Sequence, residues 1–61
     1  SPNAYLTLAE YLEDYAPVDA KEIGYKLINE EIENAPLTDD VKVSVKEKLE
    51  KIKSGERDLY F

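Results

Sequence analysis

The 61-residue sequence contains no cysteine, no histidine and no methionine. Without cysteine or histidine the chain can form neither a disulfide nor a zinc-finger site, and it lacks the imidazole group that serves most acid–base catalysis. Domains of this size usually depend on disulfides, metals or association for additional stability, so we expect association to take that role. The missing methionine fits either an excised domain or a removed initiator residue.

Glycine is scarce as well. The two glycines, Gly24 and Gly55, stand 31 positions apart, so the sequence has no glycine-rich phosphate-binding loop. It also lacks the alternating acids and central glycine of a calcium-binding loop. The hydroxyl side chains have no histidine to activate them. We therefore expect no catalytic residue, no metal, no cofactor and no small-molecule substrate.

Long apolar runs are absent. No stretch approaches the roughly 20 apolar residues of a membrane-spanning helix, and no signal-peptide pattern opens the chain. With 43% hydrophobic and 36% charged residues, the composition predicts one soluble, folded domain over residues 1–61, which we place in the cytoplasm.

Positive charge is short in the first two-thirds of the chain. Residues 1–40 carry ten acids and two lysines, whereas residues 41–61 carry six basic residues and four acids. The acidic part would repel phosphate backbones, which are bound mainly through lysine and arginine. This distribution disfavours nucleic acid as a partner.

Pro17, Pro36 and Gly55 divide the chain into three segments. The first predicts a helix at about residues 8–16, begun by a Thr7–Glu10 capping box. Helical spacing places one set of apolar residues on its inner face, with the tyrosines at the core edge: Leu8, Tyr11, Leu12, Tyr15 and Ala16.

The second segment predicts a helix at about residues 20–34, begun by an Asp19–Glu22 capping box. Its apolar stripe is wider than one neighbouring helix can cover, and comprises Ala20, Ile23, Gly24, Leu27, Ile28 and Ile32, with Tyr25 at its edge. We therefore expect this helix to be the central element. Gly24 within the stripe indicates close approach of another helix, because glycine otherwise costs about 1 kcal/mol of helix propensity.

The third segment is ambiguous. Val41, Val43 and Val45 alternate with polar residues as in a strand, but Val41, Val45, Leu49 and Ile52 also share one helical face. Thr38 suits an N-cap and Gly55 a C-cap, so a helix at about residues 39–54 explains more of the residues. Val43 then points away from the core. The sequence as a whole predicts an all-α, antiparallel three-helix bundle with up-down-up topology.

An acidic cluster breaks a local rule. Glu30, Glu31 and Glu33 lie in the last turn of the second helix, where the helix dipole disfavours negative charge. Lys42 and Lys46 of an antiparallel third helix would neutralise the cluster. Alternatively, the three glutamates form an acidic patch for a basic protein surface, together with Asp39 and Asp40.

Apolar residues at the end of the sequence raise a second question. Leu59, Tyr60 and Phe61 could fold over an open end of the bundle, or they could bind a partner or a second copy of the chain. The role of Tyr25 has the same two alternatives, since tyrosine suits both the edge of a core and an interface with a partner.

These patterns favour a non-enzymatic protein–protein interaction module, and a homodimer is one form of it. It would use helix-face packing through Tyr25, Val43 and the aromatic tail formed by Leu59, Tyr60 and Phe61. A second hypothesis is a small acidic inhibitor that occupies the basic, nucleic-acid-binding groove of its target. The third, a helix-turn-helix DNA-binding regulator, is disfavoured because residues 39–54 offer no Arg, Asn or Gln to contact base edges.

Overall fold

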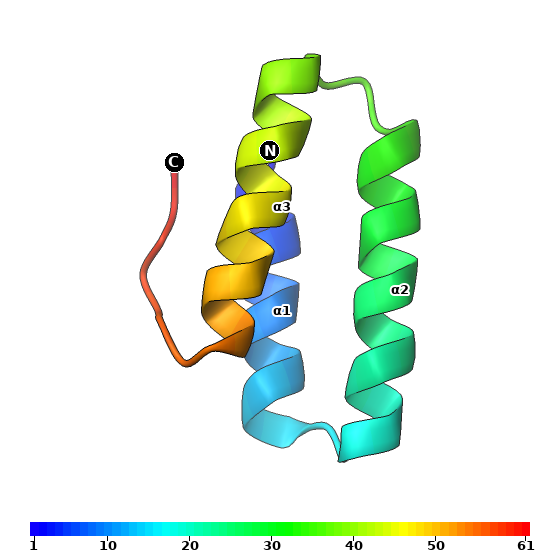
Figure 1. Cartoon of the computed structure of the whole chain (residues 1–61), viewed down its shortest axis with the longest axis vertical. Helices are drawn as coiled ribbons and strands as arrows, with labels where there is room; N and C mark the ends of the chain where they lie inside the picture. The colour runs from blue at the N-terminus through cyan, green and yellow to red at the C-terminus, as the bar shows by residue number, and fades with distance from the viewer.

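The computed structural model describes all of residues 1–61. Its helices are α1 (Asn3–Tyr15), α2 (Val18–Asn34) and α3 (Asp39–Lys53), and it contains no strand. Figure 1 shows the three helices running up and down alongside one another, followed by a C-terminal segment that turns back along the bundle. The predicted all-α three-helix bundle is confirmed, and the strand alternative for residues 41–45 is wrong.

Helix α1 begins five residues earlier than predicted. The Ser1 hydroxyl accepts a hydrogen bond from the Asn3 amide at 3.3 Å, and Pro2 between them has a helical φ of −64°. Serine at a helix start followed by proline is a favourable combination, because proline has no amide hydrogen to leave unpaired. The predicted Thr7–Glu10 capping box is wrong, since both residues lie inside the helix.

Helix α2 also lacks its predicted capping box. It begins at Val18, directly after Pro17, and no side chain caps it. Asp19 lies inside the first turn, where its Oδ1 accepts from the Ala20 amide at 3.0 Å. A carboxylate in the first turn still interacts favourably with the positive end of the helix dipole.

Both ends of α3 agree with the sequence prediction. The Thr38 hydroxyl accepts from the Val41 amide at 3.3 Å. At the other end Gly55 has a φ of 106°; its amide donates to Ile52 O at 3.0 Å, and the Glu56 amide donates to the carbonyl of residue 51 at 3.1 Å. This pair of bonds is a Schellman motif, which requires a left-handed residue and therefore favours glycine.

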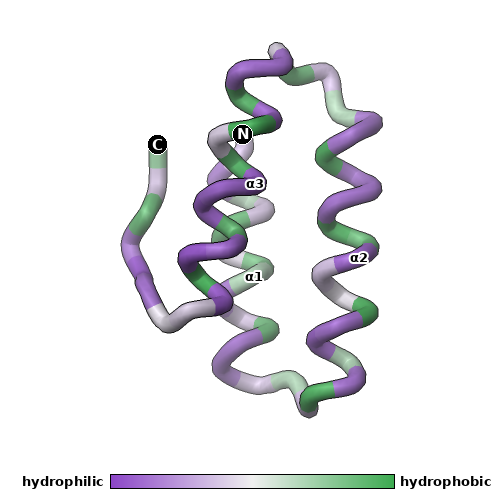
Figure 2. Tube along the Cα trace, in the orientation of Figure 1, coloured by the Kyte–Doolittle hydropathy of each residue, from purple (hydrophilic) through white to green (hydrophobic).

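The core lies between all three helices and holds eight buried side chains: Leu6, Ala9, Tyr25, Ile28, Ile32, Val45, Leu49 and Ile52. Figure 2 shows the apolar positions of each helix spaced at helical intervals along the tube. Helix α1 packs against both α3 and α2, whereas α2 and α3 contact each other less. The expectation that the second helix is central is therefore wrong; α1 is the central element.

The inner face of α1 differs from the predicted one. Leu6 and Ala9 are fully buried, whereas Tyr11 and Tyr15 are exposed, Tyr15 by 73%. The predicted placement of these tyrosines at the core edge is wrong. Because the helix starts before Leu6, that leucine can join Ala9 on one face, and the centre of the buried arc turns away from Tyr11 and Tyr15.

The C-terminal segment lies along α1 and α3, on the side away from α2 (Figure 1). Leu59 is half-buried and packs against the core cluster. Phe61 N donates to Asn3 Oδ1 at 2.9 Å, and Tyr60 Oη donates to Glu10 Oε1 at 2.8 Å. The tail thus covers a side of the bundle, and the predicted position over an open end is wrong.

Candidate functional site

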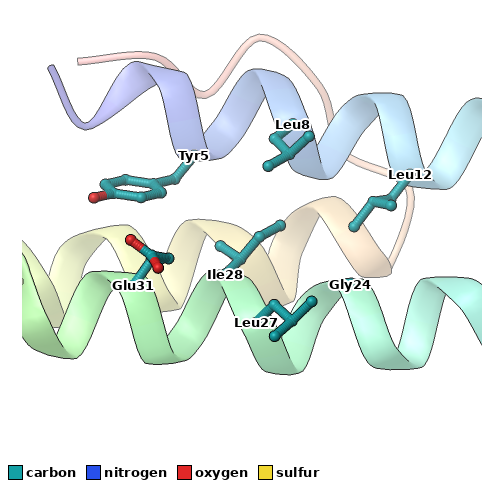
Figure 3. A pocket seen from close by; sticks show the side chains of 7 residues that line it. All are labelled: Tyr5, Leu8, Leu12, Gly24, Leu27, Ile28 and Glu31. Atoms are coloured by element: carbon teal, nitrogen blue, oxygen red, sulfur yellow. The ribbon is translucent and has the colours of Figure 1, made fainter.

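A groove of about 230 Å³ opens between α1 and α2. Figure 3 shows its lining residues, which come from both helices: Tyr5, Leu8, Leu12, Gly24, Leu27, Ile28 and Glu31. Leu12 and Gly24 lie at one end, and Tyr5 and Glu31 at the other. Glu31 is the only charged residue that lines the groove, so its surface is almost wholly apolar.

Gly24 sets the spacing of the two helices at one end of the groove. A Cβ atom at this position would lie 2.7 and 2.9 Å from the two terminal methyl carbons of Leu12, closer than carbon atoms normally pack. This confirms the prediction that Gly24 accommodates another helix. Beyond it, Ile28 points toward Leu8 and Tyr5 lies opposite Glu31 (Figure 3), and the groove is open there.

Exposed apolar residues continue from the groove onto the surfaces of both helices. On α2, Ile23 is four residues before Leu27, so the two side chains are neighbours on the helix surface. On α1, Tyr11 is three residues after Leu8 and four before Tyr15, so it is a neighbour of both on the helix surface. The ring centroids of Tyr11 and Tyr15 lie 4.8 Å apart. All five are among the large apolar side chains that the fold leaves exposed. We call these five residues and the groove the α1–α2 face.

The predicted acidic patch is divided by the fold. Glu33 forms an ion pair with Lys46, and Lys42 donates to the Glu33 carbonyl oxygen at 2.7 Å. The predicted neutralisation by these lysines therefore holds for Glu33. Glu30 and Glu31 are exposed, and no ion pair in the structure includes either of them.

Asp39 and Asp40 are exposed in the first turn of α3. Negative charge is favourable at a helix N-terminus, so their position has a structural explanation. They follow the turn after α2, beyond the end of the groove that Glu31 lines.

Tyr25 is in the core, where it is 5% exposed, so the structure does not place it on a surface open to a partner. Its hydroxyl donates to Glu13 Oε2 at 2.9 Å, and Lys53 Nζ lies 4.6 Å from its ring centroid. Burial, followed by the hydrogen bond and negative charge of Glu13, raises the pKa of Tyr25 well above its ordinary value. Lys21 in turn forms an ion pair with Glu13 at 3.6 Å.

The other predicted partner-binding residues lie away from the α1–α2 face. Val43 is 56% exposed on α3. The Leu59 carbonyl accepts a hydrogen bond from Lys48, whose ammonium group also lies 4.2 Å from the Phe61 ring centroid. Phe61 remains 54% exposed. The structure therefore does not bring Tyr25, Val43 and the tail into one site.

Sequence reasoning did not select Leu8, Ile23 or Leu27 as surface residues, because all three belong to stripes assigned to the core. One indication was present: the apolar stripe of residues 20–32 is wider than a single neighbour covers. The width of the stripe predicts two helical partners within the bundle, but part of the stripe faces solvent.

Four of the five lysines of α3 make polar contacts with other residues of the chain. Lys42 and Lys46 contact Glu33, Lys48 contacts the tail, and Lys53 pairs with Glu50 at 2.8 Å. No group of three acidic side chains is arranged to hold a metal ion. No helix combines the length and apolar character needed to cross a bilayer.

No protein-family model matches the sequence, and no curated protein and no solved structure has significant similarity to it. The functional assignment therefore rests on the geometry of the chain itself.

Proposed function

We propose that this chain is a non-enzymatic protein–protein interaction module that binds a helix of a partner on its α1–α2 face. The observation that carries the proposal is the apolar groove between α1 and α2, bordered by the exposed side chains of Leu8 and Leu27. Contiguous exposed apolar surface is typical of interaction sites. A groove between two antiparallel helices suits a third helical ridge.

The size of the face indicates a moderate affinity. Full burial of a large aliphatic side chain stabilises a complex by about 1.5–3 kcal/mol. Leu8, Ile23 and Leu27 are already partly covered, so each contributes about 1 kcal/mol on binding. Association itself costs at least about 4 kcal/mol. The partner must therefore also cover the tyrosines at the edge of the face, and we expect a reversible complex.

The tail is a weaker candidate for the binding surface. Its backbone and side chains form hydrogen bonds with α1 and α3 of the same chain. A partner that bound the tail would first have to break these hydrogen bonds. The acidic-inhibitor hypothesis remains a second proposal, supported by the unpaired Glu30 and Glu31. Charge-driven inhibition should survive Leu27→Glu, whereas binding in the apolar groove that Leu27 lines should be lost.

A display library of amphipathic helical peptides tests the proposal. Binders selected on the intact chain should lose binding to Leu27→Glu and keep it with Val43→Glu. The two positions form a matched pair, since both are helical and 56% exposed. Circular dichroism of each variant verifies that the helices remain.

Sedimentation equilibrium of the free chain completes the test. A dimer that Leu27→Glu dissociates would identify a second copy as the occupant and would support the proposal in that form. If the library yields no binder sensitive to Leu27→Glu and the chain is also monomeric, the α1–α2 face has no binding role and the proposal is wrong.

A further inference from the structure

We infer that the α1–α2 face, taken as the binding surface proposed above, is specific for a basic amphipathic helix whose positive charges gather at one end. The inference concerns the chemistry of the partner and rests on the proposed function. It follows from where the unpaired charges of this chain lie relative to the groove.

The two helices that form the groove are strongly acidic. Residues 1–34 contain eight acidic residues and two lysines, a net charge of −6. One of these lysines, Lys21, is paired with Glu13. Arg57 and Lys46 compensate two of these acids, Asp14 and Glu33, but neither of these two lines the groove.

Negative charge is concentrated at one end of the groove. Glu31 lines the groove beside Tyr5 (Figure 3), and Glu30 is the adjacent residue. Both are exposed, and neither takes part in an ion pair. They stand near the C-terminus of α2, beside the first turn of α1, which contains no acidic residue. A positive group of a partner placed here would compensate all of these charges together.

The opposite end of the groove carries no charge among its lining residues. Leu12 and Gly24 close it. Residues 24 and 31 are seven positions apart on α2, which is about 10 Å along the helix axis. A bound helix would therefore set its apolar anchors against Leu8, Leu27 and the Leu12 end. Its lysines or arginines would follow about two turns away, beside Glu30 and Glu31.

The same charges argue against a second copy as occupant. Pairing two identical α1–α2 faces would bring two net-negative surfaces together, and like charges across an interface oppose association. A basic helix has no such conflict, and it would complete a four-helix arrangement by covering the apolar residues that the three helices leave exposed.

Selection from the peptide library gives a direct test. The probes are 18-residue amphipathic helices with leucine at i, i+3, i+4 and i+7, in which the remaining positions are randomised among Lys, Glu and Gln. We expect peptides bound by the intact chain to show at least about fivefold enrichment of Lys over Glu at one end, and their Kd to rise roughly tenfold between low and high salt.

Two charge-matched double variants locate the effect. Glu30→Gln with Glu31→Gln should abolish the lysine enrichment, whereas Glu47→Gln with Glu56→Gln should leave it unchanged. Both remove two negative charges from exposed positions, and only the first pair adjoins the groove. Equal loss in both variants would mean that overall charge, not the groove, selects the peptide, and would overturn the inference.

The outcomes separate this inference from the proposed function. Binders that depend on Leu27 but show no preference for lysine would overturn the basic-helix inference and leave the interaction module standing. A Leu27-dependent homodimer would do the same, with the second copy as occupant. Absence of any Leu27-dependent binding would overturn both.

Discussion

Shortening Leu59 to alanine tests whether the tail is part of the folded core. Leu59 packs half-buried against the core cluster, between α1 and α3. The change removes three carbon atoms, each worth about 0.8 kcal/mol when fully buried. Since Leu59 is buried on one side only, we expect Leu59→Ala to lower the free energy of unfolding by about 1.5 kcal/mol. For a domain of this size that loss lowers Tm by about 6–12 °C.

Urea and thermal unfolding followed by circular dichroism measure this effect, and Leu27→Ala is the matched control. Leu27 undergoes the same chemical change in the exposed groove, so its cost should stay below about 0.5 kcal/mol. A loss for Leu59→Ala no larger than that of the control would refute the packing of the tail. The Tm of the intact chain should also be independent of protein concentration, because the tail contacts its own bundle. A Tm that rises with concentration in both the intact chain and Leu27→Glu would show instead that the tail binds a second copy.

Three further perturbations have defined expected results. Burial and the Glu13 hydrogen bond raise the pKa of Tyr25 in the folded chain, so the folded chain holds this proton more tightly than the unfolded chain does. Tyrosines of the unfolded chain titrate at about pH 10. The contribution of the Tyr25 proton to the free energy of unfolding is therefore complete below that pH and is lost as pH rises above it. Urea unfolding at pH 9 and pH 11 should therefore show a smaller loss for Tyr25→Phe than for the intact chain, and equal losses would contradict the assignment. In a Leu12→Ala background, Gly24→Ala should stabilise the chain by about 1 kcal/mol through helix propensity. With Leu12 present the gain should be distinctly smaller, because the methyl carbons of Leu12 would lie 2.7 and 2.9 Å from the new Cβ. The same gain in both backgrounds would exclude the close approach. Gly55→Ala should lower the free energy of unfolding by about 1–2 kcal/mol because of the positive φ of 106°, whereas D-alanine at that position should be tolerated, and equal losses for the two would argue against the left-handed C-cap.

Features that depend on residues within one or two helical turns were predictable from the sequence. The helix at residues 39–54 was expected with nearly its observed bounds, because Thr38 and Gly55 act on neighbouring backbone groups. Its buried face was predicted as well, since Val45, Leu49 and Ile52 recur at helical spacing. The Ser1–Pro2 pair also indicates the start of α1, but the Thr7–Glu10 pattern inside the helix predicts a later start.

The candidate site could not be predicted in the same way. Helical periodicity shows that Ile23, Leu27 and Ile28 share the apolar side of α2, but it does not say which of them a neighbour covers. The predicted acidic patch had the same limitation. Whether Glu33 or Glu31 meets a lysine depends on how α3 lies beside α2, and in the fold only Glu33 does.

By itself, the sequence determined that this chain forms three helices and which side of α3 is buried, because caps, prolines and apolar spacing act locally along the backbone. The tertiary structure decided that α1 is central, that Leu59 packs along the side of the bundle, and that part of the apolar stripe of α2 faces solvent. The physical reason is that three short helices and a tail have more apolar surface than they can bury against one another. Only their packing in three dimensions selects which part remains exposed.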